Sequence, residues 1–159
     1  LLISGGVSMG DYDLVPEVLV GMGVKKIFHK VNIKPGRPLF FGAKNKTLVF
    51  GIPGNPVSNF LAYFLFIQPA VLRIARVKSL LENRRQGILT ERCSHAKGRR
   101  DFRLVRIQER NHISFLSPVQ GKGSGDVYAL SQADGFIAIP EDIPGFKKNE
   151  KADFFTWKK

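Results

Sequence analysis

The first residues of the chain, LLISGGVSMGDYD, limit its fold more than any other stretch. Residues 1–4 form a short, largely apolar run, and Gly5 and Gly6 follow at once. Such runs are typical of interior strands in α/β sheets, because both faces of these strands are covered. In an open α/β sheet, ligands bind at loops that leave the carboxyl ends of strands. The opening therefore predicts an α/β domain with a candidate ligand loop directly after its first strand.

The remainder of the first half continues with α/β patterning. The expected elements are a helix over residues 14–22, a strand over 25–33, strands over 38–43 and 46–52 around a turn, and a helix from Val57 to about Val77. Gly23 suits the end of the first helix, and Pro56 stands near the first turn of the second, where a missing N–H does little harm. This order predicts an α/β fold for residues 1–80.

The second half differs in composition and pattern. Residues 78–110 hold ten Lys or Arg against four Asp or Glu, which marks a boundary near residues 78–86. Strand-like stretches follow at 88–96, 100–108, 113–119, 135–140 and 151–157, and the pattern shows no helical period. Residues 86–159 are therefore predicted to form a small β-barrel or sandwich, with GKGSGDVYALSQADG as a flexible hairpin.

Net charge and cysteine content indicate which partners and which cellular compartment are compatible with the chain. The formal net charge of +12 attracts anions, which leaves nucleic acid, an acidic membrane surface and a phosphorylated metabolite open as partners. Cys93 is the single cysteine, so no internal disulfide can form. This fits a reducing cytosol, and we interpret the thiol as structural. The most apolar stretch, residues 60–67, is too short to span a bilayer. These features favour a cytoplasmic protein without a membrane span.

The loop SGGVSMGD carries the first candidate site. Gly5, Gly6 and Gly10 permit positive φ and close approach of a ligand, and Ser4 and Ser8 add hydroxyl groups. Exposed backbone N–H groups in such a loop can cradle a phosphate. The alternative is a tight strand-to-helix turn, since the loop matches neither the Walker A pattern nor the dinucleotide GxGxxG pattern.

Two acids, Asp11 and Asp13, follow this loop. Two carboxylates beside a phosphate-binding loop suit a hard cation such as Mg²⁺ that also contacts the phosphates. A carboxylate there could instead position a water molecule for attack, and aspartate is also a common helix cap. One cap and one functional acid is the preferred interpretation.

Cations follow in the stretch HKVNIKPGRP. Lys30 and Lys34 are four residues apart, so on one extended strand both would point to the same face. Arg37 comes just after the turn, and three cations near a strand end can bind an oxyanion. The alternative is a solvated edge that lysine protects from pairing. His29 is interpreted as a packing or surface residue.

The third stretch, GIPGNPVS, is a rigid turn before a helix. Gly54 gives φ freedom, Asn55 can cap the helix, and Ser58 lies in its first turn. A rigid loop at a helix N-terminus is an anion site by geometry and dipole, although it can also be a simple connection. Two such loops at strand-to-helix junctions would converge at one edge of the sheet.

SGGVSMGDYD, KVNIKPGRP, FGIPGNPVS and GSGDVYALSQADGFI occur in this order, and together they resemble the C-terminal part of the MoeA family. These proteins are molybdopterin molybdenumtransferases and are related to the gephyrin E domain. The resemblance implies the C-terminal half of a MogA-like, three-layer pterin-binding α/β domain over residues 1–80, followed by a small all-β barrel domain over 86–159. It also implies an enzyme that acts with Mg²⁺ and molybdate on adenylylated molybdopterin, releases AMP and yields molybdenum cofactor.

The resemblance assigns roles residue by residue. The positions that match catalytic residues of the family are Asp13, Lys30 and Lys34. The positions that match its pterin- and phosphate-binding residues are Gly5, Gly6, Ser8, Gly54, Asn55, Ser58 and, in the β domain, Ser124. The metal would be held at Asp11 and Asp13, whereas Arg37 stands where the family varies.

The chain departs from the family because the first two domains and the opening half of the pterin domain are missing. We therefore expect a fragment that is inactive alone and exposes the sheet edge at its first strand. The resemblance implies molybdopterin, a MogA-type adenylyltransferase and a second copy of the chain as partners, with neither nucleic acid nor membrane.

Two other functions compete with this interpretation. A MogA-type molybdopterin adenylyltransferase is the nearest enzymatic alternative, but the β domain argues against it. A basic anion- or nucleic-acid-binding module would use the net charge. The arginines at positions 99, 100, 103, 106 and 110 are interpreted instead as a charged outer face, because Phe102 is the one aromatic residue among them.

Overall fold

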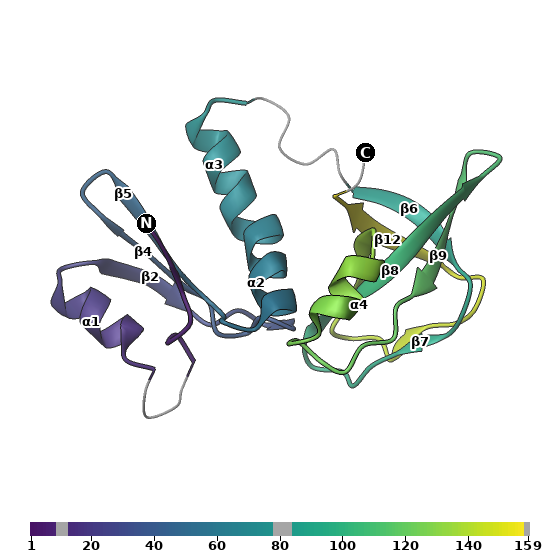
Figure 1. Ribbon diagram of the computed structural model, residues 1–159, viewed down its shortest axis with the longest axis horizontal. Helices are drawn as coiled ribbons and strands as arrows, with labels where there is room; N and C mark the ends of the chain where they lie inside the picture. The colour runs from purple at the N-terminus through teal and green to yellow at the C-terminus, as the bar shows by residue number, and fades with distance from the viewer. Residues whose placement is uncertain (9–12, 78–83, 158–159) are drawn as a thin grey trace. The chain divides into compact units, whose positions relative to one another are not determined.

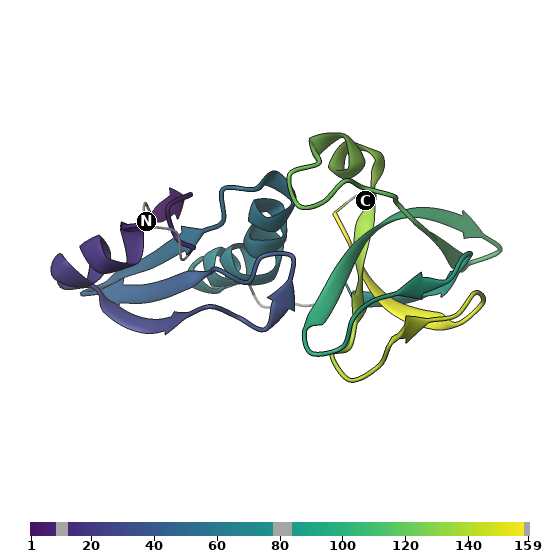
Figure 2. The same ribbon diagram turned by 90° about the horizontal axis from the view of Figure 1, so that it is seen from below.

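The structure, a computed structural model, describes residues 1–8, 13–77 and 84–157. The chain divides into two compact units, which are unit 1, Leu1–Val77, and unit 2, Lys78–Lys159. Figures 1 and 2 show the units from two directions at right angles. Unit 1 combines a sheet with helices, whereas unit 2 consists mainly of strands.

A mixed sheet forms the centre of unit 1. Its strand order is β1 (Leu2–Ser4), β5 (Thr47–Ile52), β4 (Phe40–Lys44) and β2 (Lys25–His29). β1 is parallel to β5, whereas β4 is antiparallel to both β5 and β2. β1 lies at an edge of this sheet, and the side chains of Leu1 and Leu2 are exposed. Within the described residues, β1 is therefore an edge strand, whereas its apolar run predicted an interior strand.

Helices cover both faces of the sheet, which gives unit 1 the expected three layers (Figure 1). On one face, Leu19 of α1 (Val15–Gly21) packs in a core with Val49 of β5. On the other face, Phe50 packs in a core with Ile67 from the second helical layer. Successive strand residues point to opposite faces, so the neighbours Val49 and Phe50 enter different cores.

The second helical layer is one run of 19 residues, Pro56–Ile74. It consists of α2 (Pro56–Ala62), the π-helical turn η1 (Tyr63–Ile67) and α3 (Gln68–Ile74). Pro69 lacks the N–H that a regular α-helix requires, and the wider π-turn just before it accommodates that gap.

Among the described helices, this run alone is long and apolar enough, by length and composition, to cross a membrane. The helix was expected from Val57 to about Val77, but its length was compared with a bilayer only over the most apolar stretch, residues 60–67, and on that point the expectation was wrong. Ala62 and Ile67 of this run are buried against the sheet of unit 1. A core helix of a folded domain passes the same test of length and composition.

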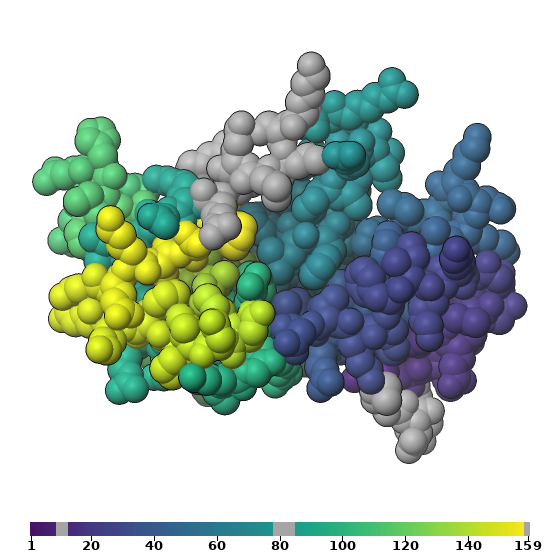
Figure 3. Space-filling view, turned by 180° about the vertical axis from the view of Figure 1, so that it is seen from behind, coloured from purple at the N-terminus to yellow at the C-terminus, as the bar shows by residue number. Residues whose placement is uncertain are grey.

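The strands of unit 2 close into a barrel. Around the barrel they are β10 (Gly135–Ile139), β12 (Lys151–Thr156), β6 (Arg84–Leu89), β9 (Ile113–Pro118) and β8 (Arg100–Arg110), and β8 pairs back with β10. Val105, Leu116 and Phe154 fill its interior. Closure removes open sheet edges, and it confirms the barrel implied by the family resemblance. The space-filling view in Figure 3 shows the last strand, in yellow, on the surface of unit 2.

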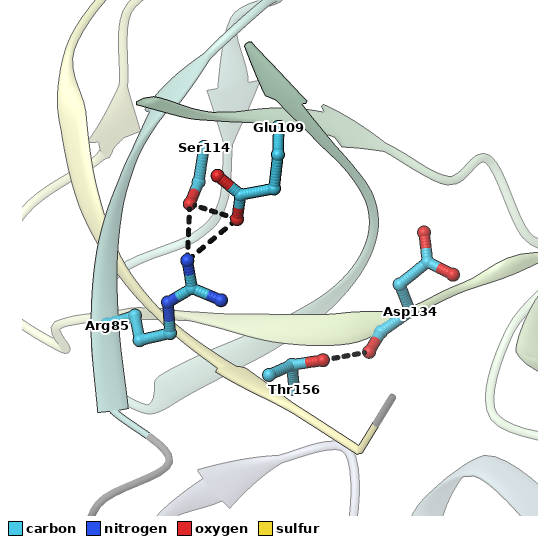
Figure 4. Close-up of polar contacts among 5 residues, drawn as sticks. All are labelled: Arg85, Glu109, Ser114, Asp134 and Thr156. Carbon is cyan, nitrogen blue, oxygen red and sulfur yellow. Dashed lines mark hydrogen bonds and ion pairs between the residues drawn. The ribbon is translucent and has the colours of Figure 1, made fainter. Parts of the chain in front are cut away.

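Polar side chains link several barrel strands (Figure 4). Arg85 of β6 donates to Glu109 of β8 at 2.7 Å and to Ser114 of β9 at 3.4 Å. Ser114 in turn donates to Glu109 at 2.8 Å. The hydroxyl of Thr156 donates to the backbone carbonyl of Asp134 at 3.0 Å, which ties the end of β12 to the start of β10.

Unit 2 also contains a helix that the sequence analysis missed. α4 (Val127–Gln132) lies in the stretch interpreted as a flexible hairpin, so that interpretation is wrong. Asp126 caps α4, because its carboxylate accepts from the amides of Lys122 and Ala129 at 2.9 Å each. These backbone hydrogen bonds, first the one from Lys122, hold the pKa of Asp126 below its usual value. The helix is short and depends on its cap more than on periodicity.

A separate two-stranded ribbon pairs β7 (Cys93–Ser94) with β11 (Gly145–Phe146). Cys93 is buried in the barrel core, and this burial raises the pKa of its thiol. A buried thiol that resists ionisation is a poor nucleophile, which agrees with a structural role.

Candidate functional site

The glycine-rich loop leaves β1 in a sharp turn toward α1. Gly5 (φ 85°) and Gly6 (φ 66°) adopt left-handed conformations that favour glycine. The Gly5 amide donates to the Ile52 carbonyl at 2.9 Å, so it is used by the sheet. The Gly6 carbonyl accepts from the Val15 amide at 3.1 Å. No backbone hydrogen bond joins the amide of Gly6 or Ser8 to another described residue, so these are the loop amides suited to an anion.

Gly6→Ala is expected to destabilise unit 1 more than Gly5→Ala. Both positions are left-handed, which costs alanine about 1 kcal/mol. A Cβ at Gly6 would also lie 2.9 Å from Cγ2 of Val15, whereas a Cβ at Gly5 would meet nothing within 4 Å. We expect losses of about 2 kcal/mol and about 1 kcal/mol, measured by urea denaturation with helical circular dichroism. Equal losses would contradict this description of the loop.

Asp13 stands half-buried just before α1. The N-cap of this helix is Leu14, which makes no side-chain cap hydrogen bond, so the helix-cap interpretation is wrong for Asp13. Asp11 and Gly10 lie outside the described residues. The pairing of the two carboxylates therefore stays a prediction.

The glycine-rich loop and the GIPGNPVS loop lie side by side, as expected from their positions after the parallel strands β1 and β5. A Cβ on Gly54 would lie 3.5 Å from the Cα of Gly5. The side-chain amide of Asn59 donates to Oγ of Ser4 at 2.8 Å and to the carbonyl of Pro53 at 3.1 Å. The predicted convergence of the two loops is therefore confirmed.

The lysine-bearing segment reaches the same edge of the sheet. Nε2 of His29, at the end of β2, lies 2.8 Å from the carbonyl oxygen of Val7. In the following turn, a Cβ on Gly36 would lie 3.5 Å from the carbonyl oxygen of Ser58. β1, β5 and β2 run in the same direction, and three stretches far apart in the sequence meet at their carboxyl ends.

The two lysines reach this edge differently from the way the sequence suggested. β2 ends at His29, and Lys30 takes a left-handed conformation with φ 83°. Lys34 belongs to a separate short strand, β3 (Ile33–Lys34). The two lysines therefore do not share one extended strand, and the prediction that their spacing places them on one face is wrong. They lie instead in the segment between His29 and Gly36, here called the lysine-bearing turn. His29 is bonded to Val7 at one end of this segment, and Gly36 lies close to Ser58 at the other.

The charges on this segment are not neutralised within the described chain. Lys30 is half-buried, and Lys34 and Arg37 are exposed. None of these three cations forms an ion pair with another described residue. Cations of this kind, close to loop amides, produce a positive potential that favours an anionic ligand.

The structure gives positions for three further predicted site residues, Asn55, Ser58 and Ser124, but no contact with a ligand. Asn55 occupies the N-cap position of α2, as predicted, but its side chain makes no cap hydrogen bond. Ser58 is 4% exposed, which puts its hydroxyl inside unit 1. Ser124 belongs to unit 2, in the loop just before Asp126. Contacts of these residues with a ligand remain predictions.

A magnesium site is not complete within the described residues. Residues 1–8, 13–77 and 84–157 hold no group of three or more His, Cys, Asp or Glu side chains suited to a metal ion. Asp13 fits Mg²⁺ only as one ligand among other oxygens, such as substrate phosphates, which is a common arrangement for this ion.

The arginines of β8 have partners within unit 2. Arg100 binds Glu141 at 3.2 Å, Arg103 binds Asp101 at 2.9 Å, and Arg106 donates to the side-chain and backbone oxygens of Gln132. Side chains held in this way are less available to phosphates, which favours a charged outer face over a nucleic-acid groove.

Asn59 was not among the predicted site residues, and His29 was interpreted only as a packing or surface residue. His29 does pack, with its ring centroid 6.1 Å from that of Phe40, and it also reaches the glycine-rich loop. The signal for Asn59 was its position inside a predicted helix, where asparagine is a poor helix former.

Two family descriptions match the chain, one for each unit. Residues 1–73 match a family described as "Probable molybdopterin binding domain", and residues 86–157 match "MoeA C-terminal region (domain IV)".

Curated relatives match along nearly the whole chain. A molybdopterin molybdenumtransferase of Synechocystis is 32% identical, with 99% of this chain and 38% of that protein covered. A putative molybdopterin biosynthesis protein of Methanocaldococcus jannaschii is 34% identical, with 99% and 36% covered. The chain thus spans less than two fifths of the length of these relatives.

Solved structures give the same result. The molybdopterin biosynthesis MoeA protein of Pyrococcus horikoshii is 28% identical, with a TM-score of 0.81 over 99% of this chain and 37% of that one. A molybdenum cofactor biosynthesis protein of Pyrococcus furiosus, also 28% identical, has a TM-score of 0.68 over 84% of this chain and 46% of that one.

Proposed function

Because this chain belongs to the MoeA family, to whose C-terminal part both of its units correspond, we propose that it serves in molybdenum cofactor biosynthesis. In this proposal it is the molybdopterin-binding part of a molybdopterin molybdenumtransferase. The substrates are adenylylated molybdopterin and molybdate, and the products are molybdenum cofactor and AMP. The enzyme acts in the cytoplasm and receives its substrate from a MogA-type adenylyltransferase.

One observation carries the proposal. Two glycine-containing loops and a lysine-bearing turn meet at the carboxyl ends of β1, β5 and β2. The carboxyl ends of strands are where open α/β sheets bind ligands, and the cations there lack carboxylate partners among the described residues. Such a site suits a ligand that carries phosphate groups.

The proposed roles follow from charge and position. Lys30 and Lys34 neutralise the oxyanions of phosphate and molybdate, which lowers the repulsion between two anionic substrates. The amides of Gly6 and Ser8 hold a phosphate oxygen. Asp13 positions water or, together with substrate phosphates, holds Mg²⁺, which would supply Lewis-acid polarisation of those phosphates.

The remaining predicted residues complete the proposal. Gly5, Gly54 and Asn55 shape the loops, Asp11 joins Asp13 at the metal, and Ser58 and Ser124 support the substrate. A homodimer is the proposed assembly, because the family resemblance places the complete site between two subunits. On this basis the chain alone binds the pterin but does not complete the reaction.

Substitution of Lys34 tests the site within the chain itself. Lys34→Ala should weaken molybdopterin binding about tenfold, the effect of losing one charge-assisted hydrogen bond. Isothermal titration would measure this loss, and Asp13→Asn is expected to impair only the later chemical step. Lys46→Ala is the matched control, since Lys46 is an exposed lysine in the β4–β5 turn at the opposite end of the sheet. Equal affinity in Lys34→Ala and Lys46→Ala would remove Lys34 from the site.

A further inference from the structure

Asn59 connects the two loops at the point where the sheet can no longer do so. The backbone ladder between β1 and β5 ends with the bond from the Gly5 amide to the Ile52 carbonyl. Beyond that bond, the two strands continue as the glycine-rich loop and the GIPGNPVS loop, which no ladder joins within the described residues. The side-chain amide of Asn59 donates to Ser4, at the end of β1, and to Pro53, just after β5.

The placement of Asn59 on a helix makes this connection rigid. Asn59 is half-buried in α2, and its backbone amide makes the helical bond to the Asn55 carbonyl at 2.8 Å. Its side chain therefore projects from a fixed backbone toward both loops. Asparagine is intrinsically unfavourable inside a helix, so the helix itself does not explain this residue.

We propose that Asn59 is a positioning residue, which holds the glycine-rich loop and the GIPGNPVS loop in the relative position that the anionic ligand requires. The identity of the ligand rests on the proposed function, whereas the role of Asn59 in holding the two loops together does not depend on it. Asn59 acts through Ser4 and Pro53, and it makes no contact with the ligand itself.

Asn59→Ala separates positioning from folding. Alanine is the better helix former, so α2 should persist and the unfolding temperature should change little. Loss of the two hydrogen bonds should speed amide exchange about tenfold at Gly5 and at Val15, whose amide is bonded to the Gly6 carbonyl. The amide of Val24, bonded to the Leu19 carbonyl on the other side of α1, should be unchanged. NMR-detected hydrogen exchange measures all three.

The same variant should bind molybdopterin about tenfold more weakly than the wild-type chain, because the loops must first be ordered. Gln68→Ala is the matched control, since it removes another half-buried amide from the same helical run. Asn59→Leu keeps the side-chain shape without polar atoms or charge, and it should behave as Asn59→Ala does. Ser4→Ala should reproduce part of the loss, and adding it to Asn59→Ala should cause no further loss.

The outcomes separate the two claims. Unchanged exchange at Gly5 and Val15 in both Asn59 variants overturns the positioning role, whatever the binding result. Weaker binding with unchanged exchange also overturns it, because Asn59 would then touch the ligand directly. If the wild-type chain binds no molybdopterin, the proposed function fails, whereas faster exchange in the variants would still support the role of Asn59.

Discussion

Gly135→Ala is expected to destabilise unit 2 by about 3 kcal/mol or more, because the added methyl group has nowhere to go. Gly135 is buried on β10 and pairs with both Val105 of β8 and Thr156 of β12. A Cβ there would overlap the carbonyl oxygen of Phe155 and lie 3.1 Å from its carbonyl carbon. These atoms belong to the backbone of β12, so relief requires β10 and β12 to separate and breaks a pairing within the closed barrel.

The single tryptophan makes this measurement specific to unit 2. The ring of Trp157 lies 5.0 Å from the ring of Phe136, the residue after Gly135. Urea denaturation followed by Trp157 fluorescence should show the loss in Gly135→Ala. Gly125→Ala is the control, because a Cβ at Gly125 meets nothing within 4 Å, and it should leave the transition in place. A wild-type transition in Gly135→Ala would mean that the strands do not close as described.

Arg103→Ala is expected to lower the free energy of unfolding of unit 2 by about 3 kcal/mol, because it leaves the buried carboxylate of Asp101 without its charged partner. Asp101 is 1% exposed and accepts a hydrogen bond from Nε of Arg103 at 2.9 Å, and a terminal nitrogen of the same guanidinium forms an ion pair with it at 2.9 Å. The buried ring of His95 lies 3.8 Å away and donates most closely to the Ile143 carbonyl at 2.8 Å. This loss is at the low end for a broken buried ion pair. The side chain of Arg103 is 41% exposed, so its removal lets water reach the carboxylate of Asp101.

Arg106→Ala provides the comparison on the same strand. Arg106 is exposed and donates to Gln132, so its loss should cost less than about 1 kcal/mol. Trp157 fluorescence again reports the transition. Equal effects of the two substitutions would indicate that Asp101 does not depend on Arg103, which would contradict the buried pair.

The sequence was most informative where local chemistry and topology agree. The apolar run before Gly5 and Gly6 predicted a strand with a loop at its carboxyl end, and parallel β1 and β5 bring that loop to the GIPGNPVS loop. Two strand-like runs around a turn predicted the β4–β5 hairpin, and its residues fill two cores on opposite faces of the sheet. These features depend on local composition and turn residues, which a single sequence contains.

Features set by one residue's backbone or by distant contacts were not predictable in the same way. Nothing in the alternating pattern of residues 25–33 shows that Lys30 turns left-handed and ends the strand. α4 is too short to show a helical period, and its stability depends on the cap at Asp126. The partners of Asn59 are 55 and 6 residues away, so only the folded chain brings them together.

The central claim is that the edge formed by the two loops and the lysine-bearing turn binds molybdopterin selectively. The most direct measurement titrates molybdopterin into the 159-residue chain as salt rises from about 0.05 to about 0.2 M, with and without a competing oligonucleotide. The account predicts saturable binding at one site per chain that persists across this range and is not displaced by the oligonucleotide. Absence of saturable binding, or displacement by the oligonucleotide with a steep loss in salt, would contradict it.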